Sequence, residues 1–275
     1  MRVVLAELAP VRGEPLANLR TLEATVRRYN GAHLIAFPEL FLSGYRVGDQ
    51  AHLLALEPGS PLLGRVQKAA RRSGAWIVVG APWRSSPRAG EIQNAAIWVD
   101  PSGSVSVQGK RFLPTFGPFE EGLHYAPGRR GLVLPSPWGK LGAEICYDVF
   151  FPEVSRDLAM GGADLLVILS ASPVTSRPLF ERLLPARAIE NGLWVAYVNR
   201  TGVEDGLVFA GGSGIWTPQG VAVDPAESRT EGEDRVLSFD IEPTGTRRWR
   251  PFRPVLRDLG VAFPDERDPE GPRHA

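Results

Sequence analysis

The sequence predicts a mixed β-sheet covered by helices, a fold of the α/β or α+β class. Short apolar runs typical of strands alternate with longer segments whose apolar residues recur at helical spacing. Two turn signals, at residues 100–103 and 217–220, add hairpins to this alternation. The length of 275 residues and the hydrophobic content of 43% suffice for one large domain or two small ones.

Strands are expected where apolar residues run without interruption. The two runs on either side of Asp100-Pro101-Ser102-Gly103 flank a turn and should therefore form a hairpin. A second hairpin is expected around the turn at residues 217–220, and it precedes the last strand. The expected strands cover residues 3–6, 34–37, 76–80, 93–99, 104–108, 141–146, 164–169, 194–199 and 236–241.

Helices are expected where apolar residues return every three or four positions. Leu19, Leu22 and Val26 follow this spacing in the first such segment. Pro152 opens another segment, and proline suits the first turn of a helix. The expected helices cover residues 16–26, 62–72, 152–160 and 179–191.

The composition indicates one domain followed by a short tail. No change of composition marks an internal linker, so residues 1–263 are expected to form a single domain. Residues 264–275 are rich in Pro, Asp, Glu, Arg and Gly. This C-terminal tail is expected to be poorly ordered unless it docks on a surface such as a partner subunit.

The charge balance and the apolar runs exclude several classes of partner. Lys and Arg total 31, as do Asp and Glu, so the net charge argues against nucleic acid or an anionic membrane surface. No apolar run approaches the roughly 18 residues that a membrane span needs. The first apolar stretch is broken by Glu7, which makes it a poor signal peptide. With no disulfide framework either, a cytoplasmic location is expected.

Cys146 is the only cysteine in the chain. It therefore cannot form an internal disulfide or contribute to a cysteine-rich zinc site. It closes the apolar run at residues 141–146, which leaves two interpretations: a small buried hydrophobe or a nucleophile. Free cysteine is among the most buried residue types, so the position alone favours the first.

Three other reactive groups, however, accompany Cys146 at the ends of predicted strands. Glu39 follows the strand at 34–37, Lys110 follows the strand at 104–108, and Glu121 lies in the Pro/Gly-rich loop after it. Taken alone, each has a simpler explanation: a helix cap or exposed carboxylate for Glu39, a surface charge for Lys110 and a loop charge for Glu121, and the first two are then favoured over a functional role. Because strand ends meet at one edge of a sheet, we expect the four groups to converge.

A thiol, a carboxylate and an ammonium are the groups that amide cleavage requires. The thiol must ionise to attack, and a carboxylate whose pKa is raised by desolvation can take its proton. The tetrahedral intermediate carries an oxyanion that an ammonium and a backbone N–H can stabilise; losing one such donor costs about 3 kcal/mol. Lysine occurs only at residues 68, 110 and 140, and its compact charge suits this task.

Three motifs, in chain order, carry a family resemblance. Residues 37–40 read Phe-Pro-Glu-Leu, residues 110–121 run from Lys110 to Glu121, and residues 142–153 surround Cys146. Residues 197–200 and 211–213 supply weaker downstream signatures. Together they resemble the general-base, lysine and nucleophile motifs of the nitrilase superfamily of carbon–nitrogen hydrolases. The resemblance extends from about residue 3 to residue 252.

The resemblance implies a four-layer α-β-β-α sandwich and an assignment of roles. Glu39 would be the general base, Lys110 the oxyanion stabiliser and Cys146 the nucleophile. Glu121 would be the second glutamate, which orients the substrate and the lysine. The backbone N–H of Tyr147 would be the other oxyanion donor, and neither a metal nor an organic cofactor is implied.

The resemblance also implies a homodimer or a higher homo-oligomer. Relatives pair the helices that correspond to residues 152–160 and 179–191 across a two-fold axis, and such a patch closes as a dimer. The second helix carries more apolar surface than a covering helix needs. Its apolar residues include Leu183, Leu184, Ala188 and Ile189.

The residues after the cysteine favour one branch of the superfamily. Tyr147-Asp148 follows Cys146, where nitrilases in the strict sense usually carry Trp-Glu, so an amidase or a carbamoyl hydrolase is favoured. Relatives that bind a substrate carboxylate place arginines at positions 149 and 150, where this chain has Val149 and Phe150. The predicted substrate is therefore a neutral amide or N-carbamoyl compound, although these residues are equally well explained as core. The candidate substrate contacts are Phe116, Phe150, Ser170, Arg177 and Arg200.

Two other functions stay open at this point. Residues 169–173, 198–200 and 211–213 also resemble glutaminase domains of NAD synthetases, which would suit an ammonia-supplying subunit of a complex. A catalytically inactive scaffold with the same fold is the other alternative. The intact set of reactive residues speaks against the inactive scaffold.

Overall fold

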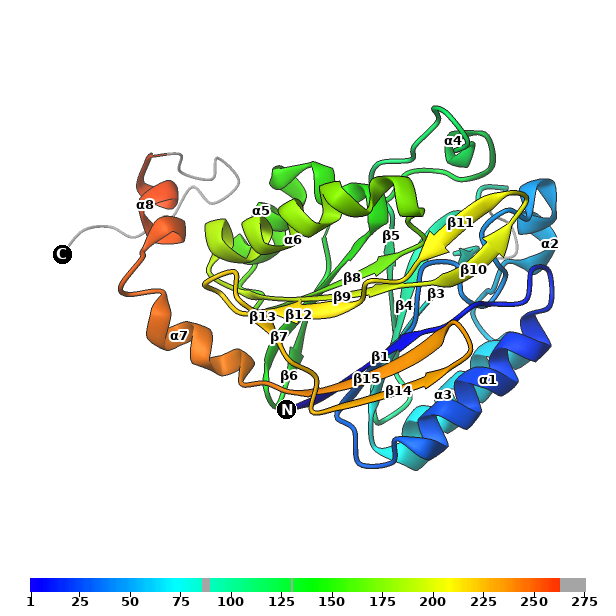
Figure 1. Cartoon of the computed structure of the whole chain (residues 1–275), viewed down its shortest axis with the longest axis horizontal. Coiled ribbons are helices and arrows are strands. Elements are labelled where there is room, and N and C mark those ends of the chain that lie inside the picture. The colour runs from blue at the N-terminus through cyan, green and yellow to red at the C-terminus, as the bar shows by residue number, and fades with distance from the viewer. Residues whose placement is uncertain (86–89, 130, 263–275) are drawn as a thin grey trace.

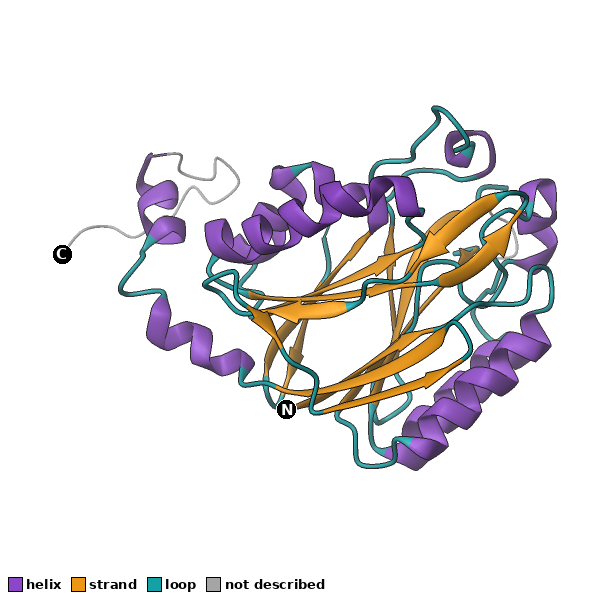
Figure 2. Cartoon of the chain, in the orientation of Figure 1, coloured by secondary structure: helices purple, strands orange, loops and turns teal. Residues whose placement is uncertain are grey.

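The computed structural model describes residues 1–85, 90–129 and 131–262. Two large sheets lie face to face, with helices on both outer sides (Figures 1 and 2). Most of the predicted single domain falls within this part. The predicted C-terminal tail, residues 264–275, lies outside the described residues.

The first sheet has seven strands in the order β14-β15-β1-β2-β3-β4-β5. Its centre is parallel, because β1 pairs with β2 and β2 pairs with β3 in the same direction. The remaining neighbours are antiparallel, including the predicted β4–β5 hairpin. The strands are β1 (Arg2–Glu7), β2 (Leu34–Ala36), β3 (Trp76–Trp83), β4 (Gln93–Val99), β5 (Val105–Gly109), β14 (Glu227–Glu231) and β15 (Asp234–Asp240).

The second sheet has six strands in the order β13-β12-β9-β8-β7-β6. Its three central strands are parallel, and its outer pairs are antiparallel. The strands are β6 (Val133–Ser136), β7 (Gly139–Ile145), β8 (Leu165–Ser170), β9 (Trp194–Asn199), β12 (Gly214–Trp216) and β13 (Ala222–Val223). A separate two-stranded hairpin consists of β10 (Thr201–Glu204) and β11 (Leu207–Ala210).

Alternating side chains on each strand assign the layers. On β1, Val3 and Leu5 pack between the two sheets, whereas Val4 faces the helices α1 (Pro15–Arg28) and α3 (Pro61–Ser73). The other sheet is covered by α5 (Pro152–Met160) and α6 (Arg177–Asn191). The order helix, sheet, sheet, helix is the predicted four-layer sandwich, which the fold confirms (Figure 1).

Several short elements had no clear signal in the sequence. The edge strand β14 is polar along its length, and β6, β10 and β11 are each only four residues long, so none of them shows a clear strand pattern. The short helices α2 (Ala51–Leu54), α4 (Glu121–His124), α7 (Thr246–Trp249) and α8 (Val255–Ala262) also went unpredicted. Helices this short are held by tertiary contacts and have weak local patterns.

The apolar face of α6 is largely used inside the chain. Leu184 and Ala188 are buried in the core between α6 and its sheet. Part of the surface that we expected to join two subunits therefore packs within one. Leu179 and Ile189 on α6, with Met160 on α5, do remain exposed, and the dimer stays a prediction. Among the described residues, no helix is long and apolar enough to cross a membrane.

Glu144 is an unusual buried carboxyl on β7. It is fully enclosed, and neither of its carboxyl oxygens has a well-aligned hydrogen-bond partner among the described residues. Burial is the main cause that raises the pKa of Glu144 to about 8, and the nearby Ser155 hydroxyl opposes the rise. The folded protein therefore holds a proton on Glu144 at pH values where the unfolded chain has lost it.

We expect Glu144→Gln to flatten the pH dependence of folding stability. In the wild type, the stability linked to Glu144 is fully present below pH 4.5, declines as the pH rises, and is lost once the pH passes about 8. Each unit of pKa difference corresponds to about 1.4 kcal/mol. The free energy of unfolding, measured with urea, should therefore fall less between pH 5 and pH 9 in Glu144→Gln than in the wild type. Equal losses in the two proteins would contradict this account.

Candidate active site

Four reactive side chains meet at one end of the two sheets. Glu39 lies shortly after β2, and Lys110 directly follows β5, both in the first sheet. Cys146 directly follows β7 in the second sheet, and Glu121 begins α4. All four side chains are buried. The structure thus brings together the residues that the sequence placed at strand ends.

Lys110 forms the centre of this cluster. Its Nζ lies 2.7 Å from Glu39 Oε1 and 2.6 Å from Glu121 Oε1. The side chain of Lys110 has no exposed surface, so the ammonium is held only by protein groups. A buried ammonium between two carboxylates keeps its charge and has a fixed position.

Asn94, Tyr45 and Ala171 complete the hydrogen bonding of the two carboxylates. Asn94 Nδ2 donates to Glu39 Oε1 at 2.7 Å and to Glu121 Oε2 at 3.2 Å. The Tyr45 hydroxyl donates to Glu121 Oε1 at 2.6 Å, and the Ala171 N–H donates to Glu39 Oε2 at 2.8 Å. Both oxygens of each carboxylate are therefore occupied, which fixes the orientation of both side chains.

The cluster carries two carboxylates against one ammonium, and its pKa values reflect this. Burial raises the pKa of Glu121 to about 7; the charge of Lys110 opposes the rise and that of Glu39 adds to it. Burial alone would lower the pKa of Lys110, but the charges of Glu121 and Glu39 outweigh it, so the pKa stays above its usual value. A carboxyl that titrates near neutrality is suited to a site that transfers protons.

Cys146 occupies a sharp turn between a strand and a helical segment. Its φ is +46°, in the left-handed region that residues with a side chain seldom adopt. It is the first residue of the 3₁₀ turn η2 (Cys146–Phe150). Backbone strain of this kind is found at functional sites. Burial, followed by the charge of Glu39, raises the pKa of the Cys146 thiol, while Lys110 opposes the shift. The resting group is therefore a thiol that needs a base.

Asp148 connects the nucleophile turn to the lysine loop. Its Oδ1 accepts the N–H of Arg111 at 3.1 Å and that of Phe112 at 2.9 Å, and its Oδ2 accepts the N–H of Ile145 at 3.2 Å. These amides belong to the residues just after Lys110 and just before Cys146. Asp148 is buried, so it acts as a positioning residue for both.

Aromatic rings form an arc around the cysteine turn. Tyr147, next to Cys146, contacts Phe116 and Phe150, each with ring centroids 5.4 Å apart. Phe150 contacts Phe180, which in turn contacts Tyr197. Phe116 is 53% exposed and Phe150 is half-buried. The predicted substrate contacts Phe116 and Phe150 thus lie in an apolar surface beside the cysteine.

The predicted contacts Ser170 and Arg177 occupy different positions. Ser170 ends β8, and its hydroxyl lies close enough to the thiol to oppose the rise in the pKa of Cys146. It makes no well-aligned hydrogen bond in the described part of the chain. Arg177 begins α6, is exposed, and pairs with Glu181 at 2.9 Å. Its guanidinium is accessible, unlike that of Arg200.

Arg200 has a structural position that differs from the expected one. We expected a substrate contact, but the side chain is buried and its guanidinium forms an ion pair with Glu204. It also donates to the Thr201 carbonyl at 3.2 Å and lies 4.3 Å from the ring centre of Phe209. A buried arginine needs such partners, and they leave it occupied without a substrate.

Three residues of the site were not singled out from the sequence. Asn94 lies near the start of β4 and is followed by the apolar residues 95–99, and an interior polar residue of this kind is the signal that could have identified it. Asp148 lies in the nucleophile motif and Tyr45 lies shortly after the general-base motif, but neither had an assigned contact. In the described residues, no group of three or more His, Cys, Asp or Glu side chains is arranged to hold a metal ion.

Comparison with known proteins identifies the family. Residues 2–251 match the family described as carbon-nitrogen hydrolase. The chain therefore belongs to the carbon–nitrogen hydrolase family, as its motifs predicted. It is a hydrolase of the amidase and nitrilase type, and the expected enzyme class is confirmed.

Three similar proteins narrow the comparison. An (R)-stereoselective amidase from a Pseudomonas species is 33% identical over 228 residues, 82% of this chain and 78% of the relative. A glutamine-dependent NAD(+) synthetase from Aquifex aeolicus is 31% identical over 257 residues, 91% of this chain but 44% of that protein.

The third is the NitN amidase from Nesterenkonia sp. AN1, whose structure aligns with a TM-score of 0.77 at 31% identity. The alignment covers 96% of this chain and 98% of the amidase. Another structure of the same amidase has acrylamide added at the active site cysteine. The fold and family agree with the predictions drawn from the three motifs.

Proposed function

We propose that the protein hydrolyses the C–N bond of a small amide or N-carbamoyl compound through a thioester at Cys146. The observation that carries this proposal is the Lys110 ammonium held 2.7 Å and 2.6 Å from two buried carboxylates beside a strained cysteine. A base, a cation and a nucleophile are the three groups that acyl transfer needs. The similarity to amidases supports the same reaction.

In the first half of the reaction, Glu39 takes the proton of the Cys146 thiol, and the sulfur attacks the carbonyl carbon. The carbonyl π electrons move to the oxygen, which becomes an oxyanion beside the Lys110 ammonium and the Tyr147 N–H. When the intermediate collapses, the C–N bond breaks and Glu39 returns the proton to the nitrogen. Ammonia or an amine leaves, and the acyl group stays on sulfur.

In the second half, a water molecule replaces the amine. Glu39 accepts a proton from the water, whose oxygen attacks the thioester carbon, and the same two donors stabilise the second oxyanion. The C–S bond then breaks, Glu39 returns the proton to the sulfur, and the acid is released. Glu121 acts by holding Lys110 in place. Its carboxylate accepts a hydrogen bond from the Lys110 ammonium and is itself fixed by a hydrogen bond from the Tyr45 hydroxyl.

The apolar surface beside Cys146 supports a neutral reacting end. Phe150 and Tyr147 belong to the same turn as Cys146, and a carboxylate next to the scissile group that packed against them would be desolvated without a cation, which is costly. An apolar tail would instead gain roughly 25 cal/mol per Å² of apolar area buried. Arg177 is the accessible arginine among the predicted contacts that could oppose this preference.

We expect neutral amides and carbamoyl compounds to be preferred over substrates with an adjacent carboxylate, and nitriles to be poor. A matched pair for this test is N-ethylurea and N-carbamoyl-D-alanine, which differ only by the carboxylate. Propionamide and propionitrile test the second comparison. A kcat/KM at least about tenfold higher for the carboxylate compound would contradict the preference, since tenfold corresponds to about 1.4 kcal/mol. Arg177→Ala would then reveal whether Arg177 is the cation.

A second candidate function is the supply of ammonia to a partner protein. The similarity to a glutamine-dependent NAD(+) synthetase supports it, because this chain matches only 44% of that longer protein. The two functions differ in what the purified protein does alone. Steady turnover of simple amides without a partner favours the free-standing amidase, whereas activity only within a stable hetero-complex favours ammonia supply. Absence of any turnover in both settings favours an inactive scaffold.

A further inference from the structure

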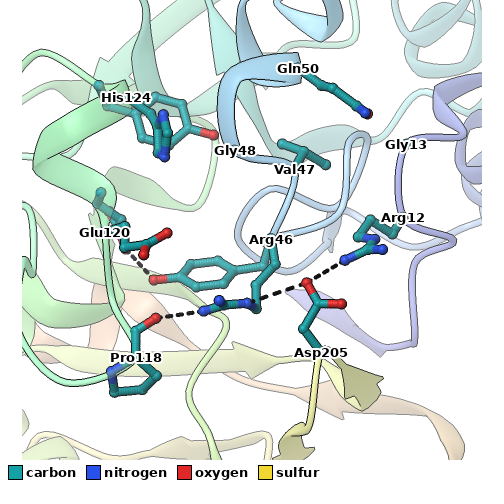
Figure 3. Close-up of a pocket in the computed structure, with 13 residues that line it drawn as sticks. Arg12, Gly13, Arg46, Val47, Gly48, Gln50, Pro118, Glu120, His124 and Asp205 are labelled. Carbon is teal, nitrogen blue, oxygen red and sulfur yellow. Dashed lines mark hydrogen bonds and ion pairs between the residues drawn. The ribbon is translucent and has the colours of Figure 1, made fainter.

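A cavity of about 520 Å³ lies on the Glu121 side of the catalytic cluster. Its inner wall is formed by Tyr45, Glu121 and Tyr125, and Figure 3 shows how its polar side chains face one another. Tyr45 links the cavity to the cluster, because its hydroxyl donates to Glu121. The cavity is large enough for more of a ligand than a single amide group.

The outer part of the cavity carries two arginines that share one carboxylate. Arg12 and Arg46 both form ion pairs with Asp205 Oδ2 (Figure 3). Arg46 Nη1 also donates to the Pro118 carbonyl at 2.6 Å, which is a neutral partner. Among these three charged groups, one positive charge is therefore unbalanced. Two converging guanidiniums with spare N–H donors suit a planar monoanion such as a carboxylate.

A buried framework holds the two arginines in place. Glu204, the residue before Asp205, accepts the backbone N–H of Tyr45 at 3.0 Å and that of Arg46 at 2.8 Å. The ion pair with Arg200 fixes Glu204 in turn. This contact ties the β10–β11 turn to the loop that carries Arg46.

A glycine brings the other arginine close to that loop. Gly44 has a φ of +82°, and a Cβ placed on it would lie 2.8 Å from the Cα of Arg12. Only glycine permits this approach of the two backbones. The Arg12 segment therefore packs directly against the residues before Arg46. This backbone contact holds the two arginines near each other, so that both can pair with Asp205.

We infer that this cavity receives the far end of the substrate and that Arg12 and Arg46 bind a carboxylate there. The inference rests on the proposed amide hydrolysis and adds a substrate class, primary amides with a carboxylate at the opposite end of the chain. It agrees with the apolar surface at Phe150, since that surface disfavours a carboxylate only near the scissile group. Glu120, which is exposed, and Glu121 at the inner wall also line the cavity, and both carboxyl groups oppose the anion and set a limit on its affinity.

The test compares three seven-carbon amides that differ only in the terminal group. Heptanamide ends in a methyl group, pimelamate in a carboxylate and 7-aminoheptanamide in an ammonium. We expect kcat/KM to be highest for pimelamate, by about tenfold over heptanamide, as charge-assisted hydrogen bonds would produce. The preference should reverse for succinamate against butanamide, because the shorter chain leaves the carboxylate beside the apolar surface. Added salt should reduce the pimelamate preference.

Variants connect the preference to the arginines. Arg46→Gln and the more exposed Arg12→Gln should each lower the pimelamate-to-heptanamide ratio several-fold, whereas Glu120→Gln should raise it. Arg229→Gln removes an exposed arginine from β14, which pairs with Glu227 of the same strand, and should leave the ratio unchanged. Thermal unfolding of each variant verifies that the protein is folded, and Arg12→Gln keeps the test valid if Arg46→Gln unfolds.

The outcomes separate this inference from the proposed function. If heptanamide is hydrolysed but pimelamate shows no advantage, or if neither arginine variant changes the ratio, the carboxylate subsite is overturned and the amidase stands. A preference for 7-aminoheptanamide would assign the cavity to cations through Glu120 and also overturn the inference. If no amide of any length is hydrolysed, the proposed function falls and the inference falls with it.

Discussion

Replacement of Cys146 by alanine is expected to abolish amide hydrolysis while the protein stays folded. The proposed reaction forms a covalent bond to this sulfur, and no other thiol is present to replace it. Loss of a nucleophile that acts together with its base typically lowers kcat by about 10⁴-fold or more. The measurement is kcat for propionamide, with thermal unfolding recorded for both proteins. The side chain is small and only one sulfur atom is lost, so a large fall in stability is not expected.

The single thiol gives this experiment a stoichiometric control. Iodoacetamide should modify the wild type once per chain, with loss of activity in proportion, and should not modify Cys146→Ala. Folded Cys146→Ala that retained normal kinetics would exclude the thioester. Activity that survived complete alkylation of the wild type would lead to the same conclusion by an independent route.

Lys110→Arg is expected to lower kcat by about 10²–10³-fold although it preserves the positive charge. The Lys110 ammonium has no exposed surface and lies within 2.7 Å of both carboxylates, so a guanidinium has no room to occupy the same point. Its planar donors would also point away from the place where the oxyanion forms. KM should change less than kcat, because the lost interaction belongs to the transition state.

Lys68→Arg is the matched control for this variant. Lys68 lies exposed on α3, far along the sequence from the cluster, and the same change of side chain there should leave kcat unaffected. Near-full activity in folded Lys110→Arg would show that the oxyanion is stabilised by another group. Glu121→Gln gives a second measurement if Lys110→Arg unfolds, because it weakens the hold on the ammonium without enlarging any side chain.

The main elements of the fold were predictable because their patterns are local. The predicted ranges for the strands of both sheet centres and for α1, α3, α5 and α6 agree with the structure to within a few residues. Strand β1 illustrates this. Its two faces pack against different apolar layers, so its sequence is a continuous apolar run that can be recognised without knowledge of the fold. The edge strand β14 is exposed along its whole length, so nothing in its sequence distinguishes it from a loop.

The candidate site was predictable where reactive groups end strands, and not where contacts cross the fold. Lys110 and Cys146 follow their strands directly and Glu39 lies shortly after its strand, so the chain order suffices to place them together. The hydrogen bonds of Asn94 to two carboxylates join residues 55 and 27 positions apart, and no local pattern encodes such pairs. Arg200 was predicted to contact the substrate because it lies in a motif. Its guanidinium instead forms an ion pair with the buried Glu204, a contact that the sequence does not reveal.

Asp148 has a consequence for how the two catalytic loops move. Its carboxylate accepts hydrogen bonds from backbone amides of both loops: those of the residues after Lys110, on the side of the first sheet, and that of the residue before Cys146, in the second sheet. Neither loop can detach without breaking bonds that also restrain the other, so they should open as one cooperative unit in local unfolding. The spacing between sulfur and ammonium is then insensitive to small sliding motions of the two sheets, and warming should preserve the site until that unit opens as a whole.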